Sequence, residues 1–279
     1  MKSVFLGIEI LFMNRITVSY FVSTVQKLFL LCVVSCSIVP AQATDHISHK
    51  EIREIADICM YSQRILKDYA LIGLGVDYHD PQKDLVDNIQ IIKHYFVDLK
   101  SHEYDKDISS EVSELDQLWQ KIVPELNKTP DKKKMTKLHQ QIEEFSHRCE
   151  VLALSMAKQL NEIEQNVVLI AQLGMETQRL AALYMMKVWD IADPNYYQQV
   201  EEVLKEYEDV YHKLLNADEK SLGKNIKEKL KKLEKNFLLF KFMAASKSGR
   251  FVPTVAERNA SKIFEETSKI LEIQERLIK

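Results

Sequence analysis

The chain has 279 residues, of which 46% are hydrophobic and 28% are charged, with acidic and basic residues mixed along its length. This balance excludes a disordered tail, and the lack of a basic patch argues against nucleic-acid binding. The sequence contains only 6 Gly and 6 Pro, which predicts long elements with few turns.

The first 43 residues have the pattern of a secretory signal peptide. Three basic residues and one acidic residue are followed by an apolar run over 28–39 and by Ala41-Gln42-Ala43. The run is too short for a stable membrane span, and Ala-x-Ala is a cleavage site. We therefore expect export to the bacterial periplasm, cleavage after Ala43 and a mature chain that begins at Thr44. In an alternative interpretation, Val33 to Cys36 form a lipobox, and a lipidated Cys36 anchors the protein to a membrane.

An internal repeat follows the signal peptide. Residues 55–69 align with 170–184 at an offset of 115, with six identities in fifteen positions, whereas average composition gives about one. The identical pairs are Ile55/Ile170, Ala56/Ala171, Met60/Met175, Gln63/Gln178, Arg64/Arg179 and Tyr69/Tyr184. The sequence therefore predicts two tandem copies of one module, over 44–160 and 161–279.

Breakers and apolar periodicity divide each copy into four helices. The expected ranges are 48–76, 81–102, 107–127 and 131–160, then 162–191, 194–215, 218–246 and 253–278. The helices are separated at Asp80-Pro81, Thr129-Pro130, Asp193-Pro194, Ser248-Gly249 and Pro253. Short connections predict antiparallel neighbours, so each copy is expected to be an up-down four-helix bundle.

No breaker lies between Pro130 and Pro194. We therefore expect the last helix of the first copy to continue into the second as one helix of up to about 60 residues, or about 90 Å. The predicted fold is all-α, with two tandem four-helix bundles joined end to end through this long shared helix.

The repeated Gln-Arg pair is the most informative feature. An apolar seam assigns Cys59, Leu66 and Tyr69 to the bundle core, which leaves Arg64 on the opposite, partly apolar side of the helix. A second apolar side predicts a second helical partner. We therefore expect a ligand-binding or partner-binding site at a contact between bundles, made of Met60, Gln63, Arg64, Met175, Gln178 and Arg179. Alternatively, Gln63-Arg64 is solvated, and Arg64 pairs with Asp68 four residues on.

These helices resemble the opening helix of the PilJ-type domain, the N-terminal periplasmic domain of type IV pili methyl-accepting chemotaxis transducers. The family pattern is approximately G-R-Q-R-M-L-S-Q-R-M-A-K-x-Y, and the similar segments here are 60–75 and 174–184. Residues 251–261 resemble the family's last helix, and nitrate and nitrite sensor kinases carry a related first helix. The resemblance implies two tandem sensory helical modules.

The chain departs from the family pattern at one important position. Cys59 and Gly174 stand where the family has its first Arg, which contacts the anion in the nitrate sensors. Only the second Arg is kept, as Arg64 and Arg179. Nitrate binding therefore does not carry over from the resemblance.

Two cysteines remain after the signal peptide, and we predict that they form a disulfide. Cys59 lies on the first helix and Cys149 on the fourth, at a similar height above the same bundle end. An exported protein folds in an oxidising compartment, where such a pair is stable.

We expect no metal centre, cofactor or enzymatic activity. His139, Glu143 and His147 share a helix face, and Glu144 with His147 has the Glu-x-x-His spacing of di-iron bundles. Such a centre needs a second Glu-x-x-His and further carboxylates from other helices, and the sequence offers none. No haem-attachment or nucleophile motif is present.

The sequence therefore predicts a sensory module that recognises a small anionic ligand or a partner. It would act through a separate membrane chemoreceptor or sensor kinase, or through a pilus component, and a homodimer is compatible with this role. The alternative is a structural helical scaffold of the cell envelope with no small ligand.

Overall fold

The computed structural model describes residues 47–191, 193–246 and 251–278. The predicted signal peptide, Cys36, Thr44 and the Ser248-Gly249 break lie outside these ranges. The described residues form eight helices and no strand, which confirms the all-α prediction. In chain order the helices are α2 (His49–Leu74), α3 (Pro81–Leu99), α4 (Lys106–Leu126), α5 (Met135–Lys158), α6 (Glu162–Val188), α7 (Tyr196–Asn216), α8 (Ile226–Ala245) and α9 (Pro253–Glu275).

Local signals fix several helix ends. Gly75 ends α2 in the left-handed conformation, with a φ of 70° that suits glycine. The Asp80 carboxylate accepts a hydrogen bond from the backbone N–H of Lys83 at 3.1 Å and so caps α3. Pro81 and Pro253 occupy the first turns of α3 and α9, where the missing N–H of proline costs nothing.

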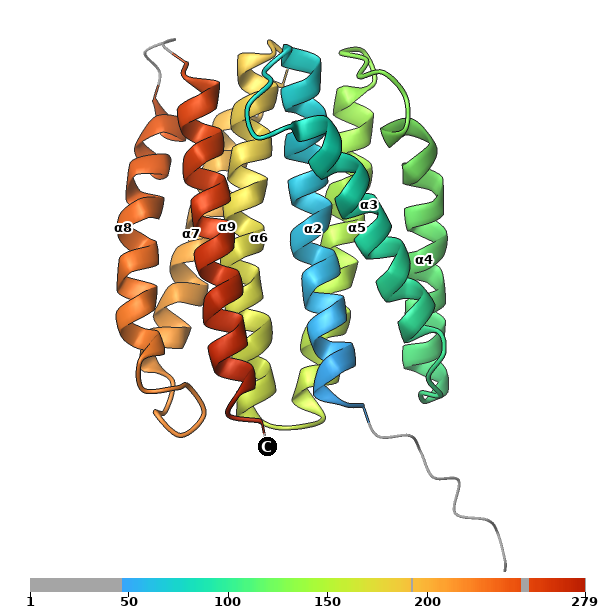
Figure 1. The fold of residues 1–279 in the computed structure, drawn as a ribbon, viewed down its shortest axis with the longest axis vertical. Helices are drawn as coiled ribbons and strands as arrows, with labels where there is room; N and C mark the ends of the chain where they lie inside the picture. The colour runs from blue at the N-terminus through green and yellow to red at the C-terminus, as the bar shows by residue number, and fades with distance from the viewer. Residues whose placement is uncertain (1–46, 192, 247–250, 279) are drawn as a thin grey trace, which may run out of the picture. The chain divides into compact units, whose positions relative to one another are not determined.

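The expected continuous helix between the two copies is not formed. Helix α5 ends at Lys158 and α6 begins at Glu162. The side chain of Asn161 accepts a hydrogen bond from the backbone N–H of Ile163 at 2.7 Å, so a cap starts α6 without any proline or glycine. The chain reverses at this point, and α6 packs antiparallel to α5 (Figure 1). The prediction of two bundles joined end to end through a shared helix is therefore wrong.

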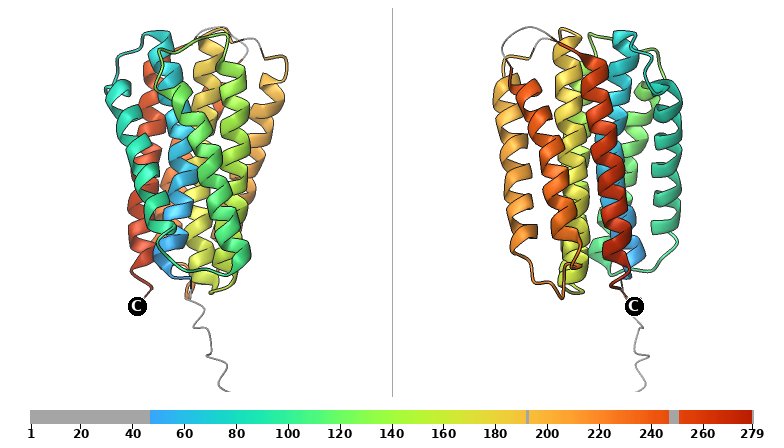
Figure 2. Two further views of the ribbon diagram at one scale, coloured as in Figure 1. Left: turned by 90° about the vertical axis from the view of Figure 1, so that its right-hand side faces the viewer. Right: turned by 60° about the vertical axis from the view of Figure 1, so that its left-hand side comes forward.

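The two halves instead lie side by side, with α2 and α6 in the middle (Figures 1 and 2). Of all helix pairs in the described chain, α2 and α6 have the most extensive contact. Three residue pairs mark this contact from end to end: His49 with Glu164, Met60 with Gly174, and Gly73 with Trp189. Their numbers differ by 115, 114 and 116. Helices α2 and α6 are therefore parallel and aligned in the register of the sequence repeat.

Glycine permits the close approach of these helices at two levels. A Cβ at Gly174 would lie 2.6 Å from Sδ of Met60, and a Cβ at Gly73 would lie 2.3 Å from the Trp189 ring. Both distances are far below van der Waals contact, so a larger residue at either position would force the Met60 side chain or the Trp189 ring to move.

Burial explains why the halves fold together. Helices α2 and α6 are buried on nearly every side, whereas the outer helices α3, α4, α7 and α8 bury one stripe. A helix that is apolar all round needs neighbours on all sides. An end-to-end rod would leave one side of α2 and one side of α6 in water.

The two repeated tyrosines have equivalent roles. Tyr69 Oη accepts a hydrogen bond from the backbone N–H of Asp131 at 3.3 Å. Tyr184 Oη accepts one from the backbone N–H of Val252 at 2.8 Å. Each tyrosine thus ties the first helix of its half to the segment that precedes the last helix.

In the described ranges, no helix is both long and apolar enough to cross a membrane.

Candidate ligand site beside Arg64

The two repeated glutamines lie at the centre of the fold. Gln63 donates through Nε2 to Oε1 of Glu143 on α5 at 2.9 Å. Gln178 donates through Nε2 to the carbonyl oxygen of Ala260 on α9, also at 2.9 Å. Both glutamines are buried. Each therefore connects the first helix of its half to the last helix of the same half, and neither is solvated.

The two repeated methionines fill the contact between the halves. Met60 packs against Gly174, the residue that precedes Met175. Met175 accepts a hydrogen bond at Sδ from the Ser146 hydroxyl at 3.2 Å. Both methionines are buried, so they act as packing residues and are not available to a ligand from solvent.

Arg179 is occupied by carboxylates from three helices. Its Nη2 lies 2.6 Å from Glu143 Oε2, and its Nη1 lies 2.6 Å from Glu206 Oε2 and 3.4 Å from Glu176 Oε2. Burial raises the pKa of Glu176 well above its usual range. Burial also opposes the ionisation of Glu143, but the hydrogen bond with His139 and the charge of Arg179 outweigh it and lower the pKa of Glu143 to about 2. Arg179 therefore lies in an ion cluster that supplies three carboxylates to its guanidinium.

Arg64 has fewer partners than Arg179. Its Nη2 lies 2.7 Å from Asp84 Oδ2 on α3, and its guanidinium carbon lies 4.4 Å from the ring centroid of Phe264 on α9. Its Nε is buried and has no hydrogen-bond partner among the described residues. Arg64 thus touches one helix from each half, and its buried Nε has no hydrogen-bond acceptor within the described chain.

A hollow of about 410 Å³ opens beside Arg64, between the start of α3 and the outer side of α9. Three of its lining residues are cationic or can become so, three are acidic, and the others are a phenyl ring and two hydroxyls. They are Arg64, His79, Lys269, Asp84, Glu265, Glu272, Phe264, Ser261 and Ser268. The hollow has a size that suits a small molecule.

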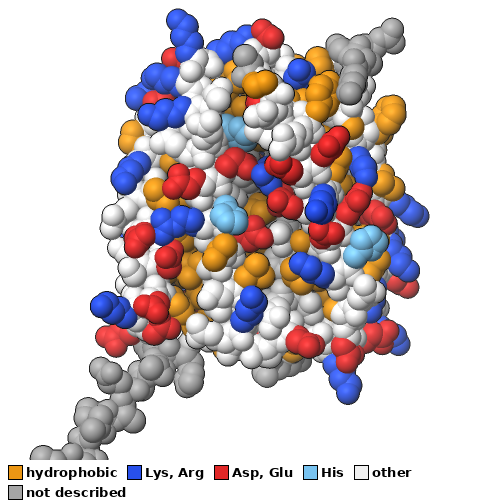
Figure 3. Space-filling model, turned by 180° about the vertical axis from the view of Figure 1, so that it is seen from behind, with side chains coloured by type: hydrophobic (Ala, Val, Ile, Leu, Met, Phe, Trp, Pro, Cys, Tyr) orange, Lys and Arg blue, Asp and Glu red, His pale blue; other side chains and the backbone are white. Residues whose placement is uncertain are grey.

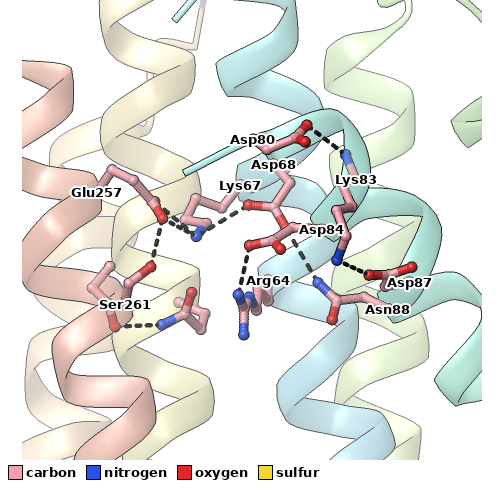
Figure 4. A network of polar contacts seen from close by, with 12 residues as sticks. Arg64, Lys67, Asp68, Asp80, Lys83, Asp84, Asp87, Asn88, Glu257 and Ser261 are labelled. Carbon is pink, nitrogen blue, oxygen red and sulfur yellow. Dashed lines mark hydrogen bonds and ion pairs between the residues drawn. The ribbon is translucent and has the colours of Figure 1, made fainter. Parts of the chain in front are cut away.

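A buried ion triad lies next to Arg64 (Figure 4). Lys67 Nζ is fully buried, 3.1 Å from Asp68 Oδ1 and 2.7 Å from Glu257 Oε2. Asn88 donates to Asp68, and the Ser261 hydroxyl donates to Glu257 at 2.6 Å. Burial alone would lower the pKa of Lys67, but the two carboxylates outweigh it and raise that pKa. Burial raises the pKa of Asp68 to about 6.

This triad connects the halves, and the sequence pattern did not predict it. The solvated alternative paired Arg64 with Asp68, but Asp68 pairs with Lys67, and Arg64 is half-buried against Asp84. The available signal was that Lys67-Asp68 falls between apolar seam positions of a helix buried on all sides. A buried charge needs a partner. Nothing in the local sequence pointed to Glu257, which lies 190 residues away.

The structure brings Cys59 and Cys149 together as free thiols. Both sulfur atoms approach the carbonyl oxygen of Ile55, Cys59 Sγ at 3.2 Å and Cys149 Sγ at 3.7 Å. Burial and the neighbouring Cys149 raise the pKa of the Cys59 thiol. The helices thus place the two cysteines in reach of one another, and the disulfide stays a prediction.

The histidine face of α5 is divided between two surroundings. His139 lies 3.6 Å from Glu143 in the Arg179 cluster, whereas His147 lines a separate hollow with Arg148 and Glu111. Among the described residues, no three His, Cys, Asp or Glu side chains are grouped so that they could hold a metal ion.

On the face turned away in Figure 1, acidic and basic side chains are mixed over the surface (Figure 3).

Comparison with models of known protein families, with curated proteins and with solved structures gives no match. The resemblance to the PilJ-type domain therefore stays a prediction from the two short helices.

Proposed function

We propose that this protein is an exported sensory module that binds a small anionic ligand in the hollow beside Arg64. The observation that carries the proposal is the difference between the two repeated arginines. Arg179 is surrounded by three carboxylates. Arg64 has one carboxylate partner, an unpartnered Nε and a hollow next to it.

The hollow is lined by three carboxylates and by the two permanent cations Arg64 and Lys269, so its chemistry favours a ligand that joins an anionic group to an amino or hydroxyl group. The planar guanidinium of Arg64 can hold a carboxylate or an oxyanion by paired hydrogen bonds. Lys269 adds positive charge, and Phe264 offers an apolar wall. Glu265 and Glu272 line the same hollow and would interact with an amino or hydroxyl group on the ligand. Short polar organic acids have this combination of groups.

The position of the hollow suggests how binding would be reported. Arg64 belongs to α2, Asp84 to α3 and Phe264 to α9, so the lining comes from both halves of the fold. A ligand that draws Arg64 away from Asp84 changes how α2 meets α3 on one side and α9 on the other. Such a ligand shifts the population of conformers that differ in how the halves meet, and a membrane receptor, sensor kinase or pilus component would recognise the shifted form.

The test compares Arg64→Ala with Arg148→Ala. Arg148 is a matched control because it pairs with two carboxylates, Glu111 and Glu114, and lines a different hollow. The melting temperature of each variant is measured with acetate, succinate, glutamate, sulfate and nitrate as probes. We expect at least one organic acid to stabilise the parent protein and Arg148→Ala. Arg64→Ala should bind that acid on the order of tenfold to a hundredfold more weakly.

Two results would count against the proposal. If Arg64→Ala keeps its fold and binds the acid as the parent does, the hollow is not the ligand site. If no probe stabilises the parent, the structural scaffold becomes the better interpretation of the chain.

A further inference from the structure

Helix α8 differs in charge from the rest of the chain. It contains six lysines and two glutamates, although acidic residues outnumber basic ones in the whole protein. Its inner side is an apolar stripe that includes Leu230, Leu233, Phe237 and Phe240, all buried. Its outer side faces away from the core, because α8 lies at the outer edge of the molecule (Figure 1).

The outer side of α8 carries a group of exposed apolar residues near its C-terminal end. Leu238, Leu239 and Phe242 are 51%, 53% and 75% exposed. They lie within one turn of each other, and Phe242 is the most exposed large hydrophobic side chain in the described ranges. Single exposed apolar residues are ordinary, whereas three neighbouring ones on one helical surface make that surface a candidate for an interaction.

Lysines lie on the same side of α8, closer to its N-terminal end. Lys231, Lys232 and Lys235 are exposed and fall on the arc that also holds Leu239 and Phe242. Lys229 and Lys232 also line a small hollow of about 100 Å³, together with Lys269, Glu266 and Ile270 from α9. Three ammonium groups and one carboxylate from two helices thus line one place, which leaves it with an excess of positive charge.

We propose that the outer side of α8 binds the surface of an anionic phospholipid bilayer. Leu238, Leu239 and Phe242 would enter the boundary between headgroups and acyl chains. The lysines would pair with lipid phosphates, and the hollow lined by Lys229, Lys232 and Lys269 would receive one of them. A surface helix with a cationic part and an apolar part is the pattern of interfacial binding.

The shape of the surface favours a bilayer over a protein partner. The three apolar side chains protrude from a single convex helix, and a deformable bilayer accepts such a surface without a matching groove. At 20 residues, α8 is about 30 Å long, so it can lie flat in the headgroup region along its full length. Lys269 also lines the hollow beside Arg64, but the other residues of this surface do not, and the variants below leave Lys269 unchanged.

The experiment measures co-sedimentation of the purified protein with vesicles. One set of vesicles contains phosphatidylcholine alone, and the other contains equal parts of phosphatidylcholine and phosphatidylglycerol. The parent protein should bind the anionic vesicles and be released by salt. Replacing Lys231, Lys232 and Lys235 by Gln should weaken binding on the order of a hundredfold. Leu239→Ser with Phe242→Ser should weaken it on the order of tenfold or more.

The matched control is Val97→Ser with Val151→Ser, which changes two residues of similar exposure on α3 and α5 and should bind as the parent does. Circular dichroism of every variant checks the fold. The proposal is overturned if the parent protein does not bind anionic vesicles, or if the α8 variants bind them with the affinity of the parent. It is also overturned if the apolar variant abolishes concentration-dependent self-association while vesicle binding is unaffected, because the surface would then be a contact between copies of the chain.

Discussion

Glu143 joins several side chains at one point between the halves. It accepts a hydrogen bond from Gln63 and lies within ion-pair distance of Arg179 and His139. Removing its charge leaves Arg179 with less compensation in a largely buried place, which is costly. We predict that Glu143→Gln lowers the free energy of unfolding by about 2 kcal/mol at neutral pH.

The pH dependence of this effect follows from the pKa of Glu143. Folding lowers that pKa from an ordinary value of 4.5 to about 2, so its contribution is fully present above pH 4.5 and is lost as the pH falls toward 2. Urea denaturation at several pH values should show the parent and Glu143→Gln converging in acid. Glu144→Gln, at an exposed position on the same helix, should differ little from the parent throughout. A stability difference that is unchanged at acid pH would contradict this account.

At the scale of single residues, the sequence revealed part of the candidate site. The recurrence of Gln-Arg identified Arg64 and Arg179, because two copies make a pattern that one does not. The different surroundings of the two arginines could not be predicted, since Asp84, Glu206 and Phe264 reach them from other helices. Only the packing of α3, α7 and α9 brings those residues close.

At the scale of helices, Gly174 leaves room for the Met60 side chain where α2 meets α6. We predict that Gly174→Val lowers the free energy of unfolding by about 1–3 kcal/mol, the usual cost of overpacking. The cause is the clash with Met60, since even a Cβ would lie 2.6 Å from its Sδ. Chemical denaturation measures the loss.

A double-mutant cycle supplies the control for this prediction. Met60→Ala opens space opposite residue 174, so the double variant Met60→Ala with Gly174→Val should be more stable than the sum of the single effects implies. Strictly additive effects would show that Met60 and position 174 do not press on each other, and that the close approach of α2 and α6 does not depend on glycine here.

Most helix positions could be predicted from breakers and periodicity, and their relative placement could not. Asp80-Pro81 and Pro253 mark real helix starts. The break before α6 could not be predicted, because a single asparagine such as Asn161 can cap a helix but can also lie inside one. The signal for side-by-side packing was present in α6, whose buried residues occur on every side, whereas a bundle helix in a rod needs only one apolar stripe.

At the scale of the whole molecule, the two halves should unfold together. They share the Lys67–Glu257 ion pair and the α2–α6 contact, so neither half keeps its core alone. The two tryptophans of the chain give one probe in each half, Trp119 in the first and Trp189 in the second. We predict that the variants Trp119→Phe and Trp189→Phe each show one fluorescence transition, which coincides with the loss of helix measured by circular dichroism.

Two independent modules would give a different result. The fluorescence midpoint of one variant would then separate from that of the other, and the circular dichroism signal would fall in two steps. The two cases are distinguished by the urea concentration at which each variant is half unfolded. For each variant, the fluorescence midpoint is compared with the midpoint of its own circular dichroism curve.

The place where the chain crosses from one half to the other bears on how such a protein could arise. The described ends lie close together, since Ser48 and Ile278 line the same hollow and Arg53 bonds Glu275 at 2.8 Å. The crossing between Lys158 and Glu162 needs only three residues. Two identical four-helix chains paired through parallel first helices would become one chain by gene duplication with a linker of this length. In the fused gene each copy has its own coding sequence, so the two copies can accumulate different residues. Arg179 can then acquire three carboxylate partners while Arg64 keeps a hollow beside it. In a symmetric homodimer both arginines would have the same surroundings.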